Sequence, residues 1–396
     1  MTSQVEKTIQ SELSLGIVQA APTQFDEPFY RYLASETGVR FAVHYFAANP
    51  SSAGVDPEIG RKVGWASAAD RGYPADFSTE PSALSFARRV VSLGHNFIVV
   101  SGYNQPHALF TALLARLKGV PIGLRSDNVL PDEGGRGRYW KMKRAAYPLF
   151  FRLYATAHPV GRKAGQYLET FGFRQNSLFR FPYAVDHRWF ARESALARSQ
   201  REATRRHWGL PPDGPVVCGV MKFSSREDPL TLVHAFKQAK TKIRNLNLLL
   251  IGDGPLRREV EDAAGDDLGK RVSLPGYQRY EMLPRAYAAS DLFVHTANGA
   301  WEVSVNEALA CGIPVVTSDE VGSAAEIVLP GGFGHTFPHA DAARLAERIA
   351  AVLDDAEMLR RAREHGLESL AEWDYPATAQ RLVDAMNFAT HRLRAA

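Results

Sequence analysis

Residues 246–255, with the sequence Leu-Asn-Leu-Leu-Leu-Ile-Gly-Asp-Gly-Pro, join an apolar run to a glycine turn. A short apolar run that ends at such a turn is typical of a buried strand. Residues 256–264 are predicted to form a helix, and residues 272–274 a further strand. A strand, a helix and a second strand in this order predict a βαβ unit, whose two strands lie parallel in one sheet.

This alternation continues over the second half of the chain. The predicted strands are 215–221, 246–251, 272–274, 292–295 and 314–317, and the predicted helices are 230–239, 256–264, 282–289, 303–311 and 340–353. A succession of βα units predicts a doubly wound parallel sheet with helices on both faces.

The first half follows the same pattern less regularly. Strands are predicted at 15–21, 39–46, 97–100 and 121–124, and helices at 28–36, 82–93, 106–118 and 161–171. Residues 47–81 are rich in Ala, Ser, Gly and Pro and are predicted to be irregular. The predicted fold class is therefore α/β, with two doubly wound, Rossmann-like parallel-sheet domains that face each other across a cleft.

The domain boundary is predicted from composition. The charged segment 194–207 is predicted to be one helix, and Pro211-Pro-Asp-Gly-Pro215 interrupts the chain after it. A hinge is therefore expected between residues 186 and 215. We assign residues 1–195 to an N-terminal domain and 196–375 to a C-terminal domain; the last helix, 376–396, could pack on either, including back on the first.

Length and composition support this organisation. A chain of 396 residues exceeds the size at which one hydrophobic core keeps growing. With 45% hydrophobic and 23% charged residues, the composition is that of a soluble globular protein. No apolar run approaches the roughly 18 residues of a membrane span, and residues 1–15 lack the apolar core of a signal peptide. We therefore expect a cytoplasmic protein, with Cys218 and Cys311 as buried free thiols.

The positive charge is concentrated in one segment. The first 200 residues carry 24 Lys and Arg against 16 Asp and Glu, and residues 134–168 contain no acid at all. This basic segment includes Tyr147-Pro-Leu-Phe-Phe-Arg-Leu-Tyr154. Two interpretations are open: the segment rests on the anionic inner face of a membrane, or its apolar residues face the core while its basic residues face water.

Several residues of the second half follow predicted strands at the edge where open sheets bind ligands. Lys222 and Arg226 come after the strand 215–221 and suit a diphosphate; the alternative is a solvated loop paired with Glu227 and Asp228. The turn Gly252-Asp253-Gly254-Pro255 lets a backbone approach a ligand closely, although such turns are also common without one.

Glu307 is an acid on an otherwise apolar predicted helix. A carboxylate among packed residues needs a partner. The diol of a ribose is a suitable partner, because a carboxylate accepts two hydroxyl hydrogen bonds; a structural N–H or Arg contact is the alternative.

Together these motifs resemble the retaining GT-B glycosyltransferases, the group that includes bacterial mannosyltransferases and relatives of sucrose synthase. The resemblance covers about residues 219–353. It is carried by Gly252-Asp-Gly-Pro255, Val272-Ser-Leu-Pro-Gly-Tyr277, residues 286–295, Asn306-Glu-Ala-Leu-Ala-Cys-Gly-Ile-Pro-Val-Val316 and Val321-Gly-Ser-Ala-Ala-Glu-Ile-Val328. Looser matches in the first half are Ser101-Gly-Tyr103, Leu124-Arg-Ser-Asp127 and Pro182-Tyr-Ala-Val-Asp186.

The resemblance implies roles for named residues. Glu307 corresponds to the second glutamate of a family pair and holds the donor ribose, whereas the first falls on Gly299. Glu302, three positions later, could project towards the same sugar. Lys222 falls on the first basic phosphate position, and Arg226 could substitute for the usual lysine, which aligns with Glu227.

Further residues complete the implied site. Tyr277 joins residues 252–255 among the donor-binding residues. Arg125 and Asp127 would line the sugar side from the N-terminal, acceptor-binding domain; an ion pair between them is the alternative. The resemblance implies no metal and no resident cofactor, the nucleotide sugar being a co-substrate, and no Asp-x-Asp pair lies near the phosphate loop.

The expected function is transfer of a sugar, with retention, from a nucleotide-diphosphate sugar to an acceptor hydroxyl in cell-surface glycan or glycolipid synthesis. A catalytically silent partner subunit would explain Gly299 and Glu227 together. A nucleotide-sugar epimerase or phosphorylase of the same fold is a further alternative. A nicotinamide-dependent oxidoreductase is disfavoured, because no Gly-x-Gly-x-x-Gly turn follows a strand with an acid about 20 residues on, and no nucleic-acid partner is expected.

Overall fold

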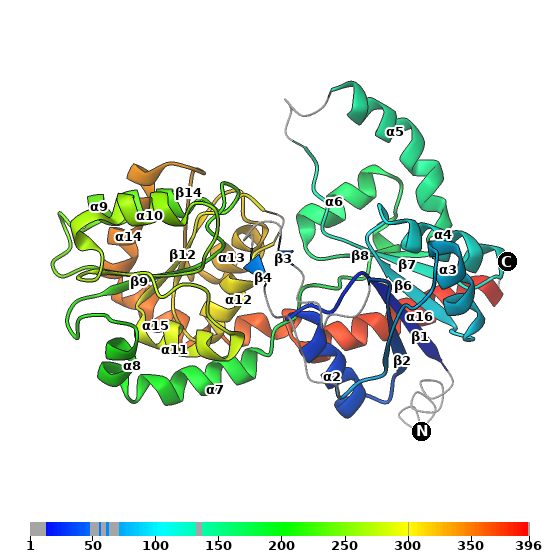
Figure 1. The fold of residues 1–396 in the computed structure, drawn as a ribbon, viewed down its shortest axis with the longest axis horizontal. Coiled ribbons are helices and arrows are strands. Elements are labelled where there is room, and N and C mark those ends of the chain that lie inside the picture. The colour runs from blue at the N-terminus through cyan, green and yellow to red at the C-terminus, as the bar shows by residue number, and fades with distance from the viewer. Residues whose placement is uncertain are drawn as a thin grey trace. The chain divides into compact units, whose positions relative to one another are not determined.

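The computed structural model describes residues 13–47, 55–56, 61–62, 71–131, 137–299 and 301–394. The chain divides into two compact units (Figure 1). Unit 1 comprises Met1–Gly54, Gly64–Ala184 and Tyr375–Ala396, and unit 2 comprises Val55–Val63 and Val185–Asp374. The main crossing into unit 2 therefore lies between Ala184 and Val185, and the last helix belongs to unit 1.

Unit 1 contains a six-stranded sheet in the order β5-β2-β1-β6-β7-β8, and every neighbouring pair is parallel. Its strands are β1 (Ser14–Gln19), β2 (Arg40–Tyr45), β5 (Ala75–Phe77), β6 (Phe97–Ser101), β7 (Ile122–Ser126) and β8 (Thr156–Pro159). Its helices are α2 (Asp26–Glu36), α3 (Ala83–Ser92), α4 (Pro106–Leu117), α5 (Arg138–Phe150), η2 (Phe151–Leu153), α6 (Arg162–Thr170), η3 (Gln175–Ser177) and α16 (Tyr375–Arg394).

Helices cover both faces of this sheet, as the apolar sequences of its strands require. Successive side chains of a strand point to opposite faces. Ile17 and Val99 pack with α2 and α16 in one core, and Val18 and Val100 pack with α3, α4 and α6 in another. The red helix α16 in Figure 1 completes the first of these layers.

Unit 2 repeats the architecture with the strand order β11-β10-β9-β12-β13-β14, again all parallel. Its strands are β9 (Val216–Val220), β10 (Asn247–Ile251), β11 (Val272–Ser273), β12 (Leu292–His295), β13 (Val315–Ser318) and β14 (Gly334–Phe337). Its longer helices are α7 (His187–Arg198), α8 (Arg201–His207), α9 (Pro229–Ala239), α10 (Arg257–Ala264), α11 (Leu283–Ala289), α12 (Val303–Ala310), α14 (Ala342–Asp354) and α15 (Ala356–His365). The predicted fold class, two doubly wound parallel sheets, is confirmed.

Two local predictions need correction. The single helix predicted at 194–207 is two helices: α7 begins at His187, where the Asp186 carboxylate accepts the Trp189 N–H at 2.9 Å, and α8 begins anew at Arg201. The segment 47–81 is not wholly irregular, because β5 pairs with β2, and Val55–Asp56 (β3) pairs antiparallel with Arg61–Lys62 (β4). The rest of that prediction, at 48–54, 57–60 and 63–70, lies outside the described residues.

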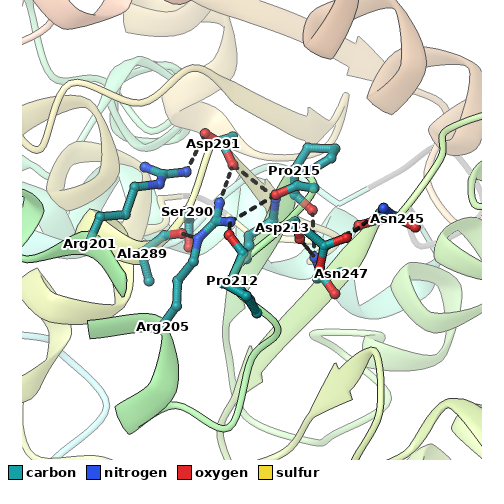
Figure 2. A network of polar contacts seen from close by, with 12 residues as sticks. Arg201, Arg205, Pro212, Asp213, Pro215, Asn245, Asn247, Ala289, Ser290 and Asp291 are labelled. Atoms are coloured by element: carbon teal, nitrogen blue, oxygen red, sulfur yellow. Dashed lines mark hydrogen bonds and ion pairs between the residues drawn. The ribbon is translucent and has the colours of Figure 1, made fainter. Parts of the chain in front are cut away.

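A partly buried polar network fixes α8 against the sheet of unit 2 (Figure 2). The Asp291 carboxylate accepts hydrogen bonds from Arg201 at 2.6 Å and Arg205 at 3.0 Å. It also accepts the Val216 N–H, at the start of β9, at 3.0 Å. Arg205 donates in addition to the carbonyl oxygens of Ala289, Pro212 and Gly214. One arginine therefore ties α8 to the segments that directly precede β9 and β12.

Candidate functional site

The candidate site lies in unit 2, at the edge where β9, β10, β12 and β13 end. Parallel strands end at a common edge, and ligands bind there in open α/β sheets, at the point where the strand order reverses. In unit 2 this reversal falls between β9 and β12, which pair through Leu292↔Val217 and Phe293↔Cys218. The loops 221–228 and 296–302 follow these two strands.

The glycine turn after β10 braces the loop that carries Lys222. Gly252 and Gly254 have φ values of 149° and 156°. A Cβ on Gly252 would lie 1.8 Å from the Met221 carbonyl oxygen, and one on Gly254 would lie 2.6 Å from that of Phe223. The turn is therefore glycine because the backbone of the neighbouring loop passes against it. Pro255 is exposed and Asp253 is buried, with its carboxylate accepting the Gly254 N–H at 2.9 Å.

Arg226 lies between two carboxylates. Its guanidinium donates to Glu227 Oε1 at 2.5 Å and to Glu302 Oε1 at 3.1 Å. Glu227 is 5% exposed, and its Oε2 also accepts the Lys222 backbone N–H at 2.5 Å. Arg226 therefore pairs with Glu227, as the alternative interpretation of this loop predicted. The loop folds around the buried Glu227 carboxylate. Asp228, by contrast, caps α9 by accepting the Thr231 N–H.

The buried His295, at the end of β12, completes this cluster. Its Nδ1 accepts the Ala297 N–H at 3.3 Å, so the ring proton sits on Nε2, which lies 3.7 Å from Glu302 Oε2. Burial lowers the pKa of His295 to about 4, so the ring is neutral at pH 7. Burial also raises the pKa of Glu227, with His295 and Arg226 opposing this shift and Glu302 adding to it.

Glu302 fills the space beside Gly299. A Cβ on Gly299 would lie 2.5 Å from Glu302 Oε1 and 3.3 Å from an Arg226 guanidinium nitrogen. A side chain at position 299 and the present position of the Glu302 carboxylate therefore exclude each other. The carboxylate of Glu302 occupies the place that an acid at position 299 would enter.

Glu307 is 3% exposed on α12, and the hydroxyl of Tyr287 donates to its Oε2 at 2.7 Å. Burial raises the pKa of Glu307 to about 7, and the hydrogen bond from Tyr287 lowers it. A structural partner therefore satisfies one of the two carboxylate oxygens. Tyr287 lies on α11, which packs against α7.

Ser323 was not predicted as a site residue, although Val321-Gly-Ser was part of the motif that suggested the family. The helical segment after β13 begins at Gly322 and Ser323 and continues as a π-helix, Ala324–Val328. The Gly322 N–H donates to the Gly299 carbonyl at 3.2 Å. The buried Ser323 hydroxyl has no protein partner among the residues that the structure describes.

Backbone hydrogen bonds connect three of these loops directly. The Asn298 N–H donates to the Arg226 carbonyl at 3.0 Å, and Gly299 accepts from Gly322 as above. Arg226, Glu302 and Gly299 therefore meet beside a helix N-terminus, with Lys222 on the same loop as Arg226. Tyr277, which follows β11, is 42% exposed.

Arg125 and Asp127 lie in unit 1, at the end of β7. Arg125 is 5% exposed and donates to Asp26 Oδ1 at 2.8 Å and to the carbonyl oxygens of Phe181 and Pro182. Asp127 instead accepts the Tyr183 hydroxyl at 2.9 Å. Arg125 thus pairs with Asp26 rather than with Asp127, and it holds the chain just before the crossing into unit 2.

Both cysteines are buried free thiols, as predicted. Over the described ranges, no group of three His, Cys, Asp or Glu side chains is arranged to hold a metal ion. Within the same ranges, no helix combines the length and apolarity needed to cross a bilayer.

Comparison with known proteins shows which families the chain resembles. Residues 200–369 match the family described as "Glycosyl transferases group 1". The resemblance to glycosyltransferases inferred from the motifs is confirmed over these residues. A GDP-mannose-dependent monoacylated alpha-(1-6)-phosphatidylinositol monomannoside mannosyltransferase of Corynebacterium glutamicum is 28% identical over 198 residues, 47% of this chain and 50% of the relative.

A GDP-mannose-dependent alpha-mannosyltransferase of Mycobacterium tuberculosis is 30% identical over 264 residues, 62% of each chain. The chain spans about half the length of the first curated relatives it matches. Among solved structures, Anabaena HepE in complex with UDP and glucose has a TM-score of 0.73 at 17% identity, covering 95% of this chain and all of that one. Sucrose-phosphate synthase from Thermosynechococcus elongatus has a TM-score of 0.71 at 19% identity, covering 97% of this chain and all of that one. The two sheets therefore form the GT-B fold.

Proposed function

We propose that the protein transfers a sugar from a nucleotide-diphosphate sugar to an acceptor hydroxyl. The observation that carries the proposal is the meeting of the Lys222–Arg226 loop, the Gly299 loop and the helix N-terminus at Gly322 through backbone hydrogen bonds. Two basic side chains and the N-terminus of a helix suit a diphosphate, because both the charges and the positive end of the helix dipole favour an anion.

The proposed chemistry is stabilisation of the leaving diphosphate. As the glycosidic bond to the donor breaks, negative charge grows on the β-phosphate, and Lys222, Arg226 and the Ser323 hydroxyl would stabilise it in place. The acceptor hydroxyl would attack the same face of the sugar and give its proton to the leaving diphosphate, so the sugar is transferred with retention. We propose that this charge stabilisation needs no metal ion.

Glu302 and Glu307 have separate proposed roles. Because the Glu302 carboxylate fills the space beside Gly299, we propose that it accepts hydrogen bonds from the donor sugar in place of an acid at position 299. Tyr287 uses one oxygen of Glu307, and the ribose diol would use the other. Arg125 is proposed to be a positioning residue, since Asp26 and two carbonyl groups engage its guanidinium.

The donor is tested by thermal shift with GDP, UDP, GDP-mannose and UDP-glucose on the full chain. A ligand at 100 times its dissociation constant adds about 2.7 kcal/mol to the free energy of unfolding. Substituting Lys222→Gln and Arg226→Gln together should weaken nucleotide binding at least about 10-fold, the loss expected from two charge-assisted hydrogen bonds. Arg258→Gln, an exposed arginine on α10, is the matched control. Binding of no nucleotide, or equal binding in all variants, would refute the proposed donor site.

A catalytically silent subunit is the second candidate, and one observation favours it. Glu227 and Glu302 balance the charge of Arg226, which leaves Lys222 as the main cation of the loop. A silent subunit would bind nucleotide and yet neither transfer nor hydrolyse the sugar of any donor, whereas a transferase releases nucleoside diphosphate. Product analysis without an added acceptor separates both from an epimerase or phosphorylase.

We further propose a lipid-linked acceptor at an anionic membrane surface. The first relative named above acts on a phosphatidylinositol mannoside, as its name states. In this chain α5 carries Lys141, Lys143 and Arg144, and its Tyr139 and Met142 are 68% and 63% exposed. Arg136, also in the basic segment, lies outside the described residues. Vesicles with anionic lipid should bind the protein, and the triple substitution of the three basic residues to Glu should abolish this binding.

A further inference from the structure

Two adjoining hollows open in unit 1, away from the site described above. They lie where β7 and β8 begin, at the sheet edge opposite to Arg125 and Asp127. Their volumes are about 260 Å³ and about 360 Å³, and Arg152, Tyr154 and Ala155 line both. The smaller hollow extends towards α4 and α16, and the larger towards Phe171 and Phe173. Together they reach the size of small-molecule sites, which begins at about 300 Å³.

Basic side chains without acidic partners surround these hollows. Arg116 lines the smaller one, Arg174 the larger one and Arg152 both. All three side chains are exposed, and none forms an ion pair with any residue in the described part of the chain. No Asp or Glu lines either hollow. Uncompensated guanidinium groups around a recess give it a positive potential that attracts anions.

The shared wall carries one more donor. Tyr154 is 6% exposed, and its hydroxyl has no protein partner within the described residues. Burial raises the pKa of Tyr154, so the phenol keeps its proton at physiological pH. The remaining lining includes the apolar side chains of Phe151, Ile122 and Val120.

We infer that these hollows form one binding site for a phosphate-bearing ligand with a short apolar part. The phosphate faces Arg152 together with Arg116 and Arg174, because the planar guanidinium matches phosphate oxygens in pairs. The apolar part enters the recess lined by Phe151 and Ile122. This site explains part of the acid-free basic segment, residues 134–168, and it does not rest on the proposed donor site in unit 2.

The ligand chemistry has two sources, which a titration separates. The full chain is titrated calorimetrically with glycerol 3-phosphate, a free phosphomonoester, and with dihexanoyl phosphatidic acid, which adds short acyl chains to the same group. The expected dissociation constant is below about 1 mM for at least one of them, which corresponds to about −4 kcal/mol. Tighter binding of the second by about 10-fold or more assigns a lipid headgroup, and equal binding assigns a soluble phosphate ester.

Substitutions of the three arginines test whether they bind the phosphate. Arg152→Gln combined with Arg174→Gln should weaken binding at least about 10-fold, and Arg116→Gln alone should weaken it to a smaller extent. Arg88→Gln, an exposed arginine on α3 that lines neither hollow, should bind as the parent does. Because these side chains are exposed, the substitutions should leave the thermal unfolding temperature of the protein without ligand unchanged. That measurement confirms that each variant folds.

Two results would overturn the inference. One is the absence of binding of both probes to the parent protein up to about 10 mM, a concentration above any useful affinity. Another is equal binding by the Arg152/Arg174 double variant and the parent.

Discussion

Gly252 shows how closely the backbones of two site loops approach each other. A Cβ at this position would lie 1.8 Å from the Met221 carbonyl oxygen, at a φ of 149° that side chains rarely adopt. Gly252→Ala should therefore displace the loop that holds Lys222 and lower the free energy of unfolding by more than about 2 kcal/mol. Urea unfolding measures the stability, and nucleotide affinity reports the position of the loop.

Gly38→Ala is the matched control for this substitution. A Cβ at Gly38 would meet no atom within 4 Å, and its φ is not in the left-handed region. The control should be neutral or stabilising by about 0.5 kcal/mol, because alanine restricts the unfolded chain. A Gly252→Ala protein as stable as this control would contradict the tight packing described for the turn.

Glu307 makes a prediction about pH. Its pKa is about 7 in the folded protein, above the 4.5 of an ordinary glutamate, so the folded state binds the extra proton between these values. Its contribution to stability is thus present at low pH and is lost as pH rises from about 4.5 through 7. The loss is at most about 1.4 kcal/mol per pH unit. Glu307→Gln replaces the titrating carboxyl by a neutral amide. The difference in unfolding free energy between parent and variant should therefore change by up to about 1.4 kcal/mol per pH unit between pH 4.5 and 7.

Tyr287→Phe separates the hydrogen bond from the charge. Removing the hydroxyl leaves the buried Glu307 carboxyl without this donor, which should cost about 1 to 3 kcal/mol. Because that hydrogen bond lowers the pKa of Glu307, the variant should move the pH-dependent loss to higher pH. The urea midpoint of the variant, measured from pH 5 to pH 8, tests both parts. A curve with the same midpoint pH as the parent would contradict the assignment.

At the scale of secondary structure, Asp291 is the residue on which the attachment of α8 depends. It accepts hydrogen bonds from Arg201 and Arg205 (Figure 2) and from the Val216 N–H, and Arg205 is itself only 4% exposed. Asp291→Ala leaves the buried guanidinium without its acid and should lower the free energy of unfolding by about 3 kcal/mol. Chemical denaturation of the full chain gives this value directly.

The exposed pair Arg344 and Glu347 on α14 provides the comparison. Its side chains are 61% and 55% exposed, so Glu347→Ala should cost less than about 0.5 kcal/mol. Similar costs for Asp291→Ala and Glu347→Ala would mean that the network around Arg205 is no stronger than a surface ion pair.

Most elements were predictable because their sequence patterns agree with their burial. The apolar runs that became β9, β10, β12 and β13 are buried along nearly their whole length, and helices follow each of them. β14 was missed, because Gly334-His-Thr-Phe337 follows two further glycines and lacks an apolar run. β14 is an edge strand of the sheet, and it is recognised only by its parallel pairing with Val315–Ser318 of β13.

The site was predictable only in part, for a physical reason. The positions of Lys222, Arg226 and Glu307 after or between strands followed from the βα alternation. Spacing along the chain does not determine the directions of side chains. The contact of Glu302 with Gly299 and the hydrogen bond from Tyr287 to Glu307 both depend on those directions. Their roles in binding and catalysis stay predictions, as does the role of Asp127.

At the scale of the whole molecule, buried neutral histidines make the protein sensitive to acid. Burial lowers the pKa of His158 to about 3 and of His95 and His295 to about 4. The unfolded chain binds protons at these rings below about pH 6.5 and the folded protein does not, so stability falls as pH falls from 6.5 towards 4. Each ring lowers the free energy of unfolding by up to about 1.4 kcal/mol for each pH unit of acidification. Glu307 has the opposite effect, because its protonated form is favoured in the folded protein.

The acid sensitivity is tested by urea unfolding at pH 7 and pH 5.5. We expect a net loss of roughly 2 kcal/mol over this interval for the parent protein. His158→Gln replaces a titrating ring by a neutral polar group. It should therefore reduce the number of protons taken up on unfolding by about one, which makes the dependence of unfolding free energy on pH less steep. Unchanged stability at pH 5.5 would contradict the assignment of these rings as neutral.

The two units have separate hydrophobic cores, and this predicts how the chain unfolds. The core of unit 2 contains residues of β9, β10, α9 and α14, whereas the cores of unit 1 contain residues of β1, β6, α2, α3 and α16. Domains with their own cores unfold as separate cooperative units. Calorimetry should therefore resolve two transitions, and a nucleotide bound at the β9–β12 edge should raise only the transition of unit 2, by the equivalent of about 2.7 kcal/mol at 100 times its dissociation constant.

Asp291→Ala assigns the transitions, because this residue lies wholly in unit 2 and its substitution should lower the same transition that the nucleotide raises. The phosphate-bearing probes of the hollows near Arg152 should raise the other one, since those residues belong to unit 1. A nucleotide that shifted the unit 1 transition instead would move the donor site away from Lys222 and Arg226.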